Sequence, residues 1–194
     1  MKHRIITISR EFGSGGRTIG KEVARQLEIP CYDEEIINRI AKKSGLAEEY
    51  IKESGEYAAS ASKIGSLLAV KDFYGHSIQD ELWGIQRRTI LEIAREHSCV
   101  IVGRCADYIP KEKADLLKVF IHASIEKRAE RIVKVYGEND VAPEKRLMQK
   151  DKKRRAYYQL YTDEKWGNID NYHVSLDSGV LGIEKCIKII SSLY

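Results

Sequence analysis

Segment 4–21 constrains the fold of this chain more than any other. A β-branched run ending at Ser9 predicts a buried strand, and the apolar spacing that starts at Ile19 predicts a helix. The turn between them holds three glycines in four residues, namely Gly13, Gly15 and Gly16. Glycines let backbone N–H groups turn inward, and a helix N-terminus adds positive potential. The segment therefore predicts phosphate binding, although an ordinary strand-to-helix turn also uses glycines.

The glycine-rich turn departs from the usual phosphate-loop pattern, G-x-x-x-x-G-K-[ST], and two registers compete. One register places Arg17-Thr18 on the Lys-[ST] pair and Glu11 on the first glycine. The other places Gly16-Arg17 on that pair and Arg10 on the first glycine. Both registers lack the lysine. We expect Arg17 to supply the positive charge, with a planar fork that can grip a phosphate in two places.

The rest of the chain alternates between strand and helix patterns. Apolar runs predict further strands at 29–32, 98–102, 114–122 and 172–176. Helical spacing and capping residues predict helices at 15–28, 34–43, 79–97, 125–136, 144–161 and 182–192. This alternation predicts one three-layer α/β/α domain over residues 1–194, with a five-stranded parallel sheet. Residues 46–76 have weak patterning and are interpreted as an insert over the site.

Composition narrows the class of protein and of partner. The 194 residues are 43% hydrophobic and 32% charged, as in a soluble globular domain, and the net charge of +4 suits a small polyanion but not a nucleic acid. We find neither a secretory signal nor an apolar run of membrane-spanning length, which predicts a cytoplasmic protein without a membrane partner. The four cysteines lack C-x-x-C spacing, which predicts free thiols.

Two polar residues are expected at the carboxyl edge of the sheet, where open α/β sheets bind ligands. The apolar run 98–102 ends in Gly103-Arg104, and Asp33 follows the second predicted strand. Asp33 has two interpretations, because it can cap the helix that follows or contact a ligand.

The predicted helix 144–161 is strongly basic. Seven cations fall in eleven residues: Lys145, Arg146, Lys150, Lys152, Lys153, Arg154 and Arg155. Most charge runs are solvated faces, but this run could also form a lid that closes over phosphates. Interleaved tyrosines could stack on a nucleic acid or pack into the core.

These segments resemble the cytidylate kinase-like proteins, within the P-loop nucleoside monophosphate kinases. Residues 30–33 correspond to the family's F-P-Y-L-D segment, and residues 114–131 to its A-D-L-K-V-F-L-x-A-S-x-x-x-R-A-x-R run. One branch is more similar still, with the motifs S-R-E-[YF]-G-S-G-G-R, G-R-C-A-D and D-K-K-R-x-x-Y-Y. All three motifs occur here, at residues 9–17, 103–107 and 151–158.

The resemblance implies a P-loop kinase fold with a helical acceptor-binding insert at about 46–76 and a basic lid at about 137–168. It implies transfer of the ATP γ-phosphoryl group to CMP or dCMP, with Mg²⁺. By position, the residues for ATP are Gly13, Ser14, Gly15, Gly16, Arg17 and Thr18. Those for the acceptor nucleotide are Asp33, Arg39, Arg87, Arg104 and Asp107. Those for the transferring group are Arg17, Arg131, Arg154 and Arg155, and those for Mg²⁺ are Thr18 and Asp33.

The chain also departs from this family pattern. The loop lysine is missing, Cys105 replaces the aspartate of G-R-D, and Val102 stands where related kinases have an acid. Residues 54–76 do not match the cytidine-binding region. Three hypotheses follow: a kinase for a pyrimidine nucleoside monophosphate, a kinase of the same fold for another small acceptor, and a catalytically weak nucleotide-binding regulatory protein.

Overall fold

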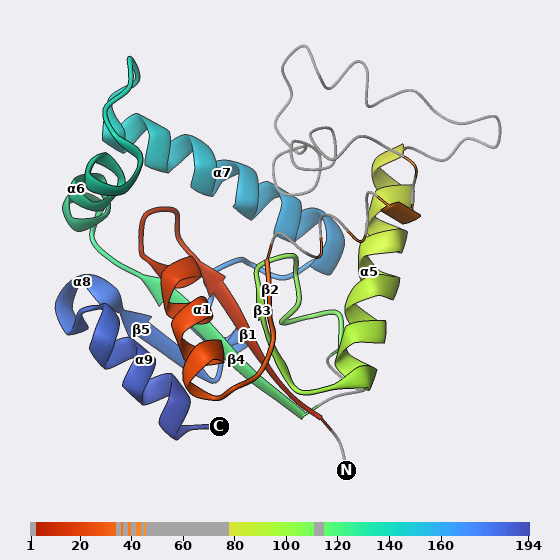
Figure 1. Cartoon of the computed structure of the whole chain (residues 1–194). Helices are drawn as coiled ribbons and strands as arrows, with labels where there is room; N and C mark the ends of the chain where they lie inside the picture. The colour runs from red at the N-terminus through yellow and green to blue at the C-terminus, as the bar shows by residue number, and fades with distance from the viewer. Residues whose placement is uncertain are drawn as a thin grey trace.

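The computed structural model describes residues 3–33, 36, 39, 42, 43, 45, 78–110 and 115–194. In this part of the chain a parallel sheet lies between helices (Figure 1). Its strands are β1 (Arg4–Arg10), β2 (Cys31–Tyr32), β3 (Cys99–Val102), β4 (Asp115–His122) and β5 (Val174–Asp177). They lie in the order β2-β3-β1-β4-β5, and each neighbouring pair is parallel. The predicted five-stranded parallel sheet is confirmed.

The helices follow the predicted alternation, with one additional short helix near the C-terminal end. They are α1 (Gly16–Gln26), α5 (Ile78–Glu96), α6 (Ile125–Tyr136), α7 (Pro143–Thr162), α8 (Ser178–Leu181) and α9 (Ile183–Ser192). The insert expected at 46–76 lies outside the described residues, as does most of the helix expected at 34–43. No helix in the described segments has the length and apolarity needed to cross a membrane.

Alternate residues of β1 face two separate cores. Ile5 packs in a cluster with α5 and the C-terminal half of α7, whereas Ile6 and Ile8 pack in a second cluster with α1 and α9. All three side chains are fully buried. Full burial of one such side chain stabilises the fold by about 1.5–3 kcal/mol, so a one-residue slip of the strand would be costly. The two cores therefore fix where β1 ends, and with it where the glycine-rich loop begins.

A third, smaller cluster joins the glycine-rich loop to helices α6 and α7. Ile132 and Leu147 are fully buried in it, and Phe12 of the loop packs against them. Gly13 marks the closest approach, because a Cβ atom there would lie 2.9 Å from Cγ2 of Ile132 and 3.0 Å from the carbonyl oxygen of Arg128. The loop is thus clamped from the side opposite the sheet.

Two differences from the predicted elements, the later start of β5 and the additional helix α8, have local causes. β5 begins at Val174, and not at Tyr172, because a 3₁₀ turn at Ile169–Asn171 takes up the Tyr172 N–H, which donates to Ile169 O across 3.1 Å. The helix expected at 182–192 is preceded by the short helix α8. Asp177 caps α8 by accepting from two backbone N–H groups, at 2.9 and 3.1 Å.

Candidate functional site

The glycine-rich loop leaves β1 at Arg10 and enters α1 at Gly16. Gly13 and Gly15 both have φ of +82°, a left-handed conformation that glycine adopts without steric cost. Helix α1 has no side-chain cap at its N-terminus. The first N–H groups of a helix have no partner within it, so this end of α1 is suited to an anion.

Ser14 anchors this loop through its side-chain hydroxyl and its backbone carbonyl. Its side chain is buried, and Oγ donates to the carbonyl oxygens of Glu11 at 2.9 Å and Ile121 at 3.1 Å. Ser178 in turn donates from Oγ to the Ser14 carbonyl oxygen at 2.6 Å. The Ser14 hydroxyl therefore holds the loop against the sheet.

Arg131 of α6 lies over the start of α1. Its Nη2 donates to Oγ1 of Thr18 at 3.0 Å, and a Cβ atom at Gly15 would lie 3.3 Å from its Cζ. A cavity opens here, beside the loop. It is lined by Gly13, Ser14, Ala123, Lys127, Arg131, Ser178, Gly179, Gly182 and Ile183. Both cations that line this cavity come from α6.

Arg17 and Asp33, which were both predicted as site residues, are brought together as an ion pair between α1 and the end of β2. The Asp33 side chain is 13% exposed and that of Arg17 is 41% exposed. Arg39 lies nearby, with Cζ 5.2 Å from the centre of the Tyr32 ring. The guanidinium of Arg17 is thus engaged at the β2 edge, while Arg131 lies against the loop itself.

The two predicted metal ligands are each in contact with an arginine. Thr18 accepts from Arg131, and Asp33 pairs with Arg17. Within the described residues, no group of three or more His, Cys, Asp or Glu side chains is placed to hold a metal ion. One hydroxyl and one carboxylate suit Mg²⁺ only when phosphate oxygens and water complete the shell, which is its usual mode in phosphoryl-transfer sites.

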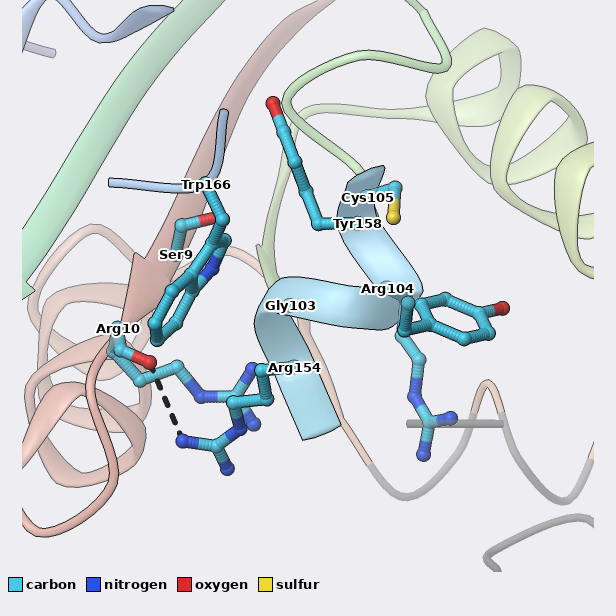
Figure 2. Close-up of a pocket in the computed structure, with 9 residues that line it drawn as sticks. Ser9, Arg10, Gly103, Arg104, Cys105, Arg154, Tyr158 and Trp166 are labelled. Carbon is cyan, nitrogen blue, oxygen red and sulfur yellow. Dashed lines mark hydrogen bonds between the residues drawn. The ribbon is translucent and has the colours of Figure 1, made fainter. Parts of the chain in front are cut away.

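A second cavity, which we call the arginine pocket, lies at the carboxyl ends of β1 and β3 (Figure 2). It is lined by Ser9, Arg10, Gly103, Arg104, Cys105, Arg154, Tyr157, Tyr158 and Trp166. Arg154 of α7 donates from Nη1 to the Arg10 carbonyl oxygen at 3.3 Å, the contact dashed in Figure 2. Three arginines and no carboxylate occur among the described residues that line it.

Arg104 is the most buried of these three arginines, with 7% of its surface exposed. Its φ is +63°, a left-handed conformation that costs energy for a residue with a side chain. Gln86 donates to its carbonyl oxygen at 3.1 Å, but its buried Nη1 has no hydrogen-bond partner among the described residues. A buried cationic donor without a partner is costly, and an anion in the pocket could satisfy it.

Asp107, another predicted acceptor residue, lies behind this pocket. Its carboxyl is buried, and Oδ2 accepts from the Tyr158 hydroxyl at 2.8 Å. Burial raises the pKa of Asp107, and the hydrogen bond from Tyr158 partly opposes that rise. Tyr158 lines the pocket and Asp107 does not, so Asp107 acts on the pocket through the tyrosine.

Two other predicted residues lie outside both cavities. Arg87 is exposed on α5. Arg155 is exposed on α7, with Cζ 5.9 Å from the centre of the Trp166 ring. Trp166 itself lines the arginine pocket, so Arg155 borders the pocket from outside.

Some lining residues were not predicted from the sequence. Arg10 had a usable signal, because it stands at the carboxyl end of the run that predicts the first strand, as Arg104 does for the run 98–102. Ser178 and Gly179 also had one, since Asp177-Ser178-Gly179 is typical of a helix N-terminus. Lys127 had none, because an exposed lysine in the first turn of a helix is ordinary.

The chain is similar to known proteins in sequence and in fold. A family model described as the cytidylate kinase-like family matches residues 5–180. The cytidylate kinase of Pyrobaculum calidifontis is 24% identical over 186 residues, which are 95% of this chain and 89% of the relative. The cytidylate kinase of Pyrococcus horikoshii is 29% identical over 159 residues, which are 81% of this chain and 71% of the relative.

Two solved structures share the fold. An uncharacterized protein from Eubacterium ventriosum is 24% identical, with a TM-score of 0.73 and 98% of each chain covered. Shikimate kinase from Bacteroides thetaiotaomicron is 18% identical, with a TM-score of 0.55, and the match covers 98% of this chain and 97% of that one. The predicted P-loop kinase fold is therefore confirmed. Because the family model spans nearly the whole sequence, the chain belongs to the cytidylate kinase-like family.

Proposed function

We propose that this protein transfers the γ-phosphoryl group of ATP to a pyrimidine nucleoside monophosphate such as CMP or dCMP. The observation that carries the proposal is the arginine pocket, with Arg10, Arg104 and Arg154 and no carboxylate among its described lining residues. A phosphate acceptor is already anionic, so it needs cations around it and no general base. A neutral hydroxyl acceptor needs a base within hydrogen-bond reach. The pyrimidine base is suggested by the two cytidylate kinase relatives.

ATP is assigned to the glycine-rich loop and the cavity beside it. The uncapped end of α1 suits its phosphates, and Lys127 and Arg131 add positive charge from α6. This loop segment borders both cavities, because Gly13 and Ser14 line the first and Arg10, at the end of β1, lines the arginine pocket. Donor and acceptor phosphates would then approach each other across the loop.

Catalysis in this arrangement rests on position and charge. Phosphoryl transfer spreads negative charge over the transferring group, and fixed cations that face this charge lower the barrier. Arg131 comes from α6 and Arg154 comes from α7, so cations from two different helices would surround the transferring phosphoryl group. Mg²⁺ bound to the ATP phosphates, with Thr18 and Asp33 as candidate ligands, would neutralise further charge. Tyr158 and Trp166 also line the arginine pocket and would form its wall beside the acceptor.

A coupled assay of ADP release tests the proposal. The protein is given ATP and Mg²⁺ with CMP, dCMP, UMP, AMP or shikimate, one acceptor at a time. We expect turnover with CMP or dCMP, loss of that turnover in Arg104→Gln, and wild-type turnover in the matched control Arg95→Ala, an exposed arginine of α5. Turnover only with shikimate would establish a hydroxyl acceptor instead. ATP binding by calorimetry without turnover of any acceptor would establish a nucleotide-binding regulator.

A further inference from the structure

We propose that Arg128 and Asp151 form a positioning pair that couples the glycine-rich loop to Arg154, so that a nucleotide on the loop changes the acceptor side through α7. This inference rests on the proposed function, because it assumes that a nucleotide binds the loop. It concerns a contact for which neither the family resemblance nor the cavities assign a role.

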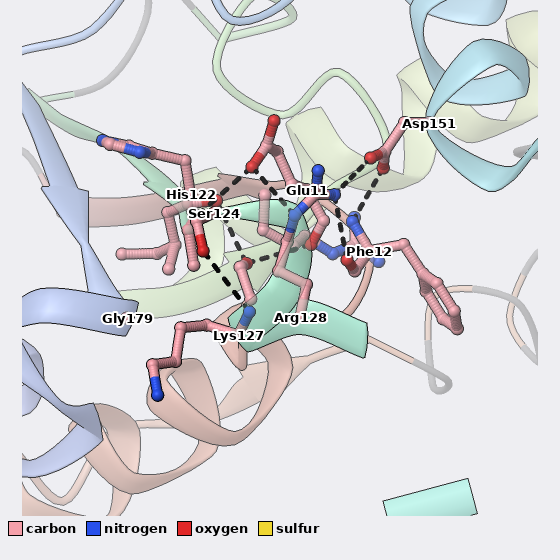
Figure 3. A network of polar contacts seen from close by, with 12 residues as sticks. Glu11, Phe12, His122, Ser124, Lys127, Arg128, Asp151 and Gly179 are labelled. Carbon is pink, nitrogen blue, oxygen red and sulfur yellow. Dashed lines mark hydrogen bonds and ion pairs between the residues drawn. The ribbon is translucent and has the colours of Figure 1, made fainter. Parts of the chain in front are cut away.

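The pair lies beside the loop and is buried (Figure 3). Nη1 of Arg128, on α6, donates to Oδ2 of Asp151, on α7, at 2.5 Å, and the two side chains are 7% and 8% exposed. Both residues also hold the backbone of Phe12. Asp151 accepts from the Phe12 N–H through Oδ1 at 2.7 Å, and Arg128 donates to the Phe12 carbonyl oxygen at 3.2 Å.

Glu11 extends this network to the sheet. Its Oε2 lies 3.4 Å from Nε of Arg128 and accepts from the Ala123 N–H, after β4, at 3.2 Å. Glu11 also donates its own backbone N–H to the Ile121 carbonyl oxygen at 3.0 Å. Two consecutive loop residues are therefore tied to β4, α6 and α7 at once.

Asp151 and Arg154 are three positions apart on α7, so their side chains leave the same face of the helix. Asp151 holds the loop at Phe12. Arg154 holds it two residues earlier, at the Arg10 carbonyl oxygen, and lies over the Phe12 ring with Cζ 5.6 Å from its centre. A displacement of residues 10–12 on nucleotide binding must then move this face of α7, and Arg154 lines the arginine pocket.

The burial of the pair favours a positioning role over a purely stabilising one. A buried ion pair contributes little net stability, because desolvation of the two charges offsets their attraction. Its geometry, however, is strongly constrained, because both side chains also bind the backbone of Phe12, Asp151 through Oδ1 and Arg128 through Nη1. The pair can therefore transmit a displacement between the loop and α7.

The variant Asp151→Asn separates these roles. Asparagine still offers an oxygen to the Phe12 N–H, but it removes the charge that Arg128 faces. Arg128→Lys is the second variant, since it keeps a charge for Asp151 and loses the fork that also reaches Glu11 and Phe12. Asp163→Asn is the matched control, at an exposed aspartate that follows the same helix.

The measurement is backbone hydrogen exchange with and without ADP and Mg²⁺. In wild type and in Asp163→Asn, we expect ADP to slow exchange in both residues 9–18 and residues 143–162, by about five-fold or more, the lower end of ordinary coupling between sites. In Asp151→Asn we expect the loop to stay protected, while protection of α7 falls below about two-fold. Arg128→Lys should give an intermediate value.

Each outcome is decisive. Equal protection of α7 in wild type and Asp151→Asn overturns the coupling and leaves the proposed function intact. No protection by ADP anywhere in wild type overturns the proposed function, and the coupling with it. If circular dichroism shows that Asp151→Asn does not fold, Arg128→Lys carries the test, and wild-type protection of α7 in that variant overturns the coupling.

Discussion

Arg131 donates a hydrogen bond from Nη2 to Oγ1 of Thr18 across 3.0 Å, and its guanidinium lies against Gly15. The usual phosphate loop carries its charge on a lysine within the loop, which this sequence lacks. Arg17 was the expected substitute, but its side chain pairs with Asp33 at the β2 edge. Of these two arginines, it is therefore Arg131 of α6 that lies against the loop.

The first prediction is that Arg131→Ala impairs the use of ATP. A hydrogen bond to a charged group is worth about 1.5–3 kcal/mol, so kcat/KM for ATP should fall by about 10- to 150-fold. Arg131→Lys should restore part of the loss, because it returns the charge without the fork. Lys134→Ala, at an exposed position of the same helix, is the control in steady-state kinetics. An Arg131→Ala enzyme with wild-type kinetics for ATP would exclude this role.

The second prediction is that Arg17 and Asp33 act as one unit. Arg17→Ala and Asp33→Asn each break the same ion pair, so the double variant should lose less than the two single losses added together. Because Arg17 is 41% exposed, solvent screens the pair, and we expect a coupling energy of only about 0.5–1 kcal/mol. A double-mutant cycle on kcat/KM measures it. Strict additivity would mean that the two side chains work independently.

The third prediction is that Arg104→Met makes the protein more stable and less active. Methionine fills a similar volume and removes a buried donor that has no partner among the described residues. We expect the free energy of unfolding to rise by about 1 kcal/mol, or Tm by about 2–4 °C. The KM for CMP should rise at least ten-fold, which corresponds to a loss of about 1.4 kcal/mol in binding free energy. Thermal unfolding and kinetics check both parts, and a lower Tm with unchanged KM would contradict the prediction.

The sheet and its order of elements followed from local patterns. Runs such as Val100–Val102 are fully buried on both faces, so their apolar residues alone identify a central strand of a parallel sheet. The glycines at 13 and 15 likewise specify the loop, because both adopt left-handed backbone conformations. These features depend on few neighbours in the sequence, which is why they could be predicted.

The partners of the charged residues could not be predicted in the same way. Arg17 and Arg131 were both predicted to contact the transferring phosphoryl group. Only the packing of α6 against the loop shows that Arg131 is the one that contacts Thr18. Asp107 was predicted as an acceptor residue, and only the fold shows that its carboxyl accepts from Tyr158, on a helix 51 positions away. Long-range side-chain contacts depend on how helices dock, and spacing along the chain does not encode that.

The fourth prediction concerns the packing of α1 against the sheet. A Cβ atom at Gly20 would lie 2.7 Å from Cγ2 of Val102 and 3.3 Å from Cδ1 of Ile8, so Gly20→Ala should force α1 away from the sheet. Overpacking of this kind costs about 1–3 kcal/mol, and it should also weaken ATP binding because α1 carries the loop. Gly84→Ala, in an open position on α5, is the matched control.

The two glycine variants should change the free energy of unfolding in opposite directions. Nothing lies within 4 Å of a Cβ atom at Gly84, so alanine there should stabilise the helix by up to about 1 kcal/mol. Urea unfolding of both variants against wild type measures the difference. A Gly20→Ala protein as stable as Gly84→Ala would show that α1 is less tightly docked than these distances indicate.

The fifth prediction is a pH dependence of stability from Asp107. Burial raises the pKa of this carboxyl above its ordinary value of 3.8. Between 3.8 and the raised pKa, the folded chain keeps a proton that the unfolded chain has released, so the free energy of unfolding falls as pH rises through that window. Asp107→Asn removes this titration and keeps an oxygen that can accept from Tyr158. Its stability relative to wild type should therefore be lowest in acid and should increase as pH rises.

Urea unfolding of wild type and Asp107→Asn between pH 4 and pH 8 measures this difference directly. Asp163→Asn, the same substitution at an exposed carboxyl beyond the end of α7, is the control measured beside it. Lys118 and Glu164 also act on Asp107, with opposite signs, so they shift the window without reversing its direction. If the difference between Asp107→Asn and wild type is flat across this range, the pKa of Asp107 is the same in the folded and unfolded chain, and the hydrogen bond from Tyr158 fully offsets the effect of burial.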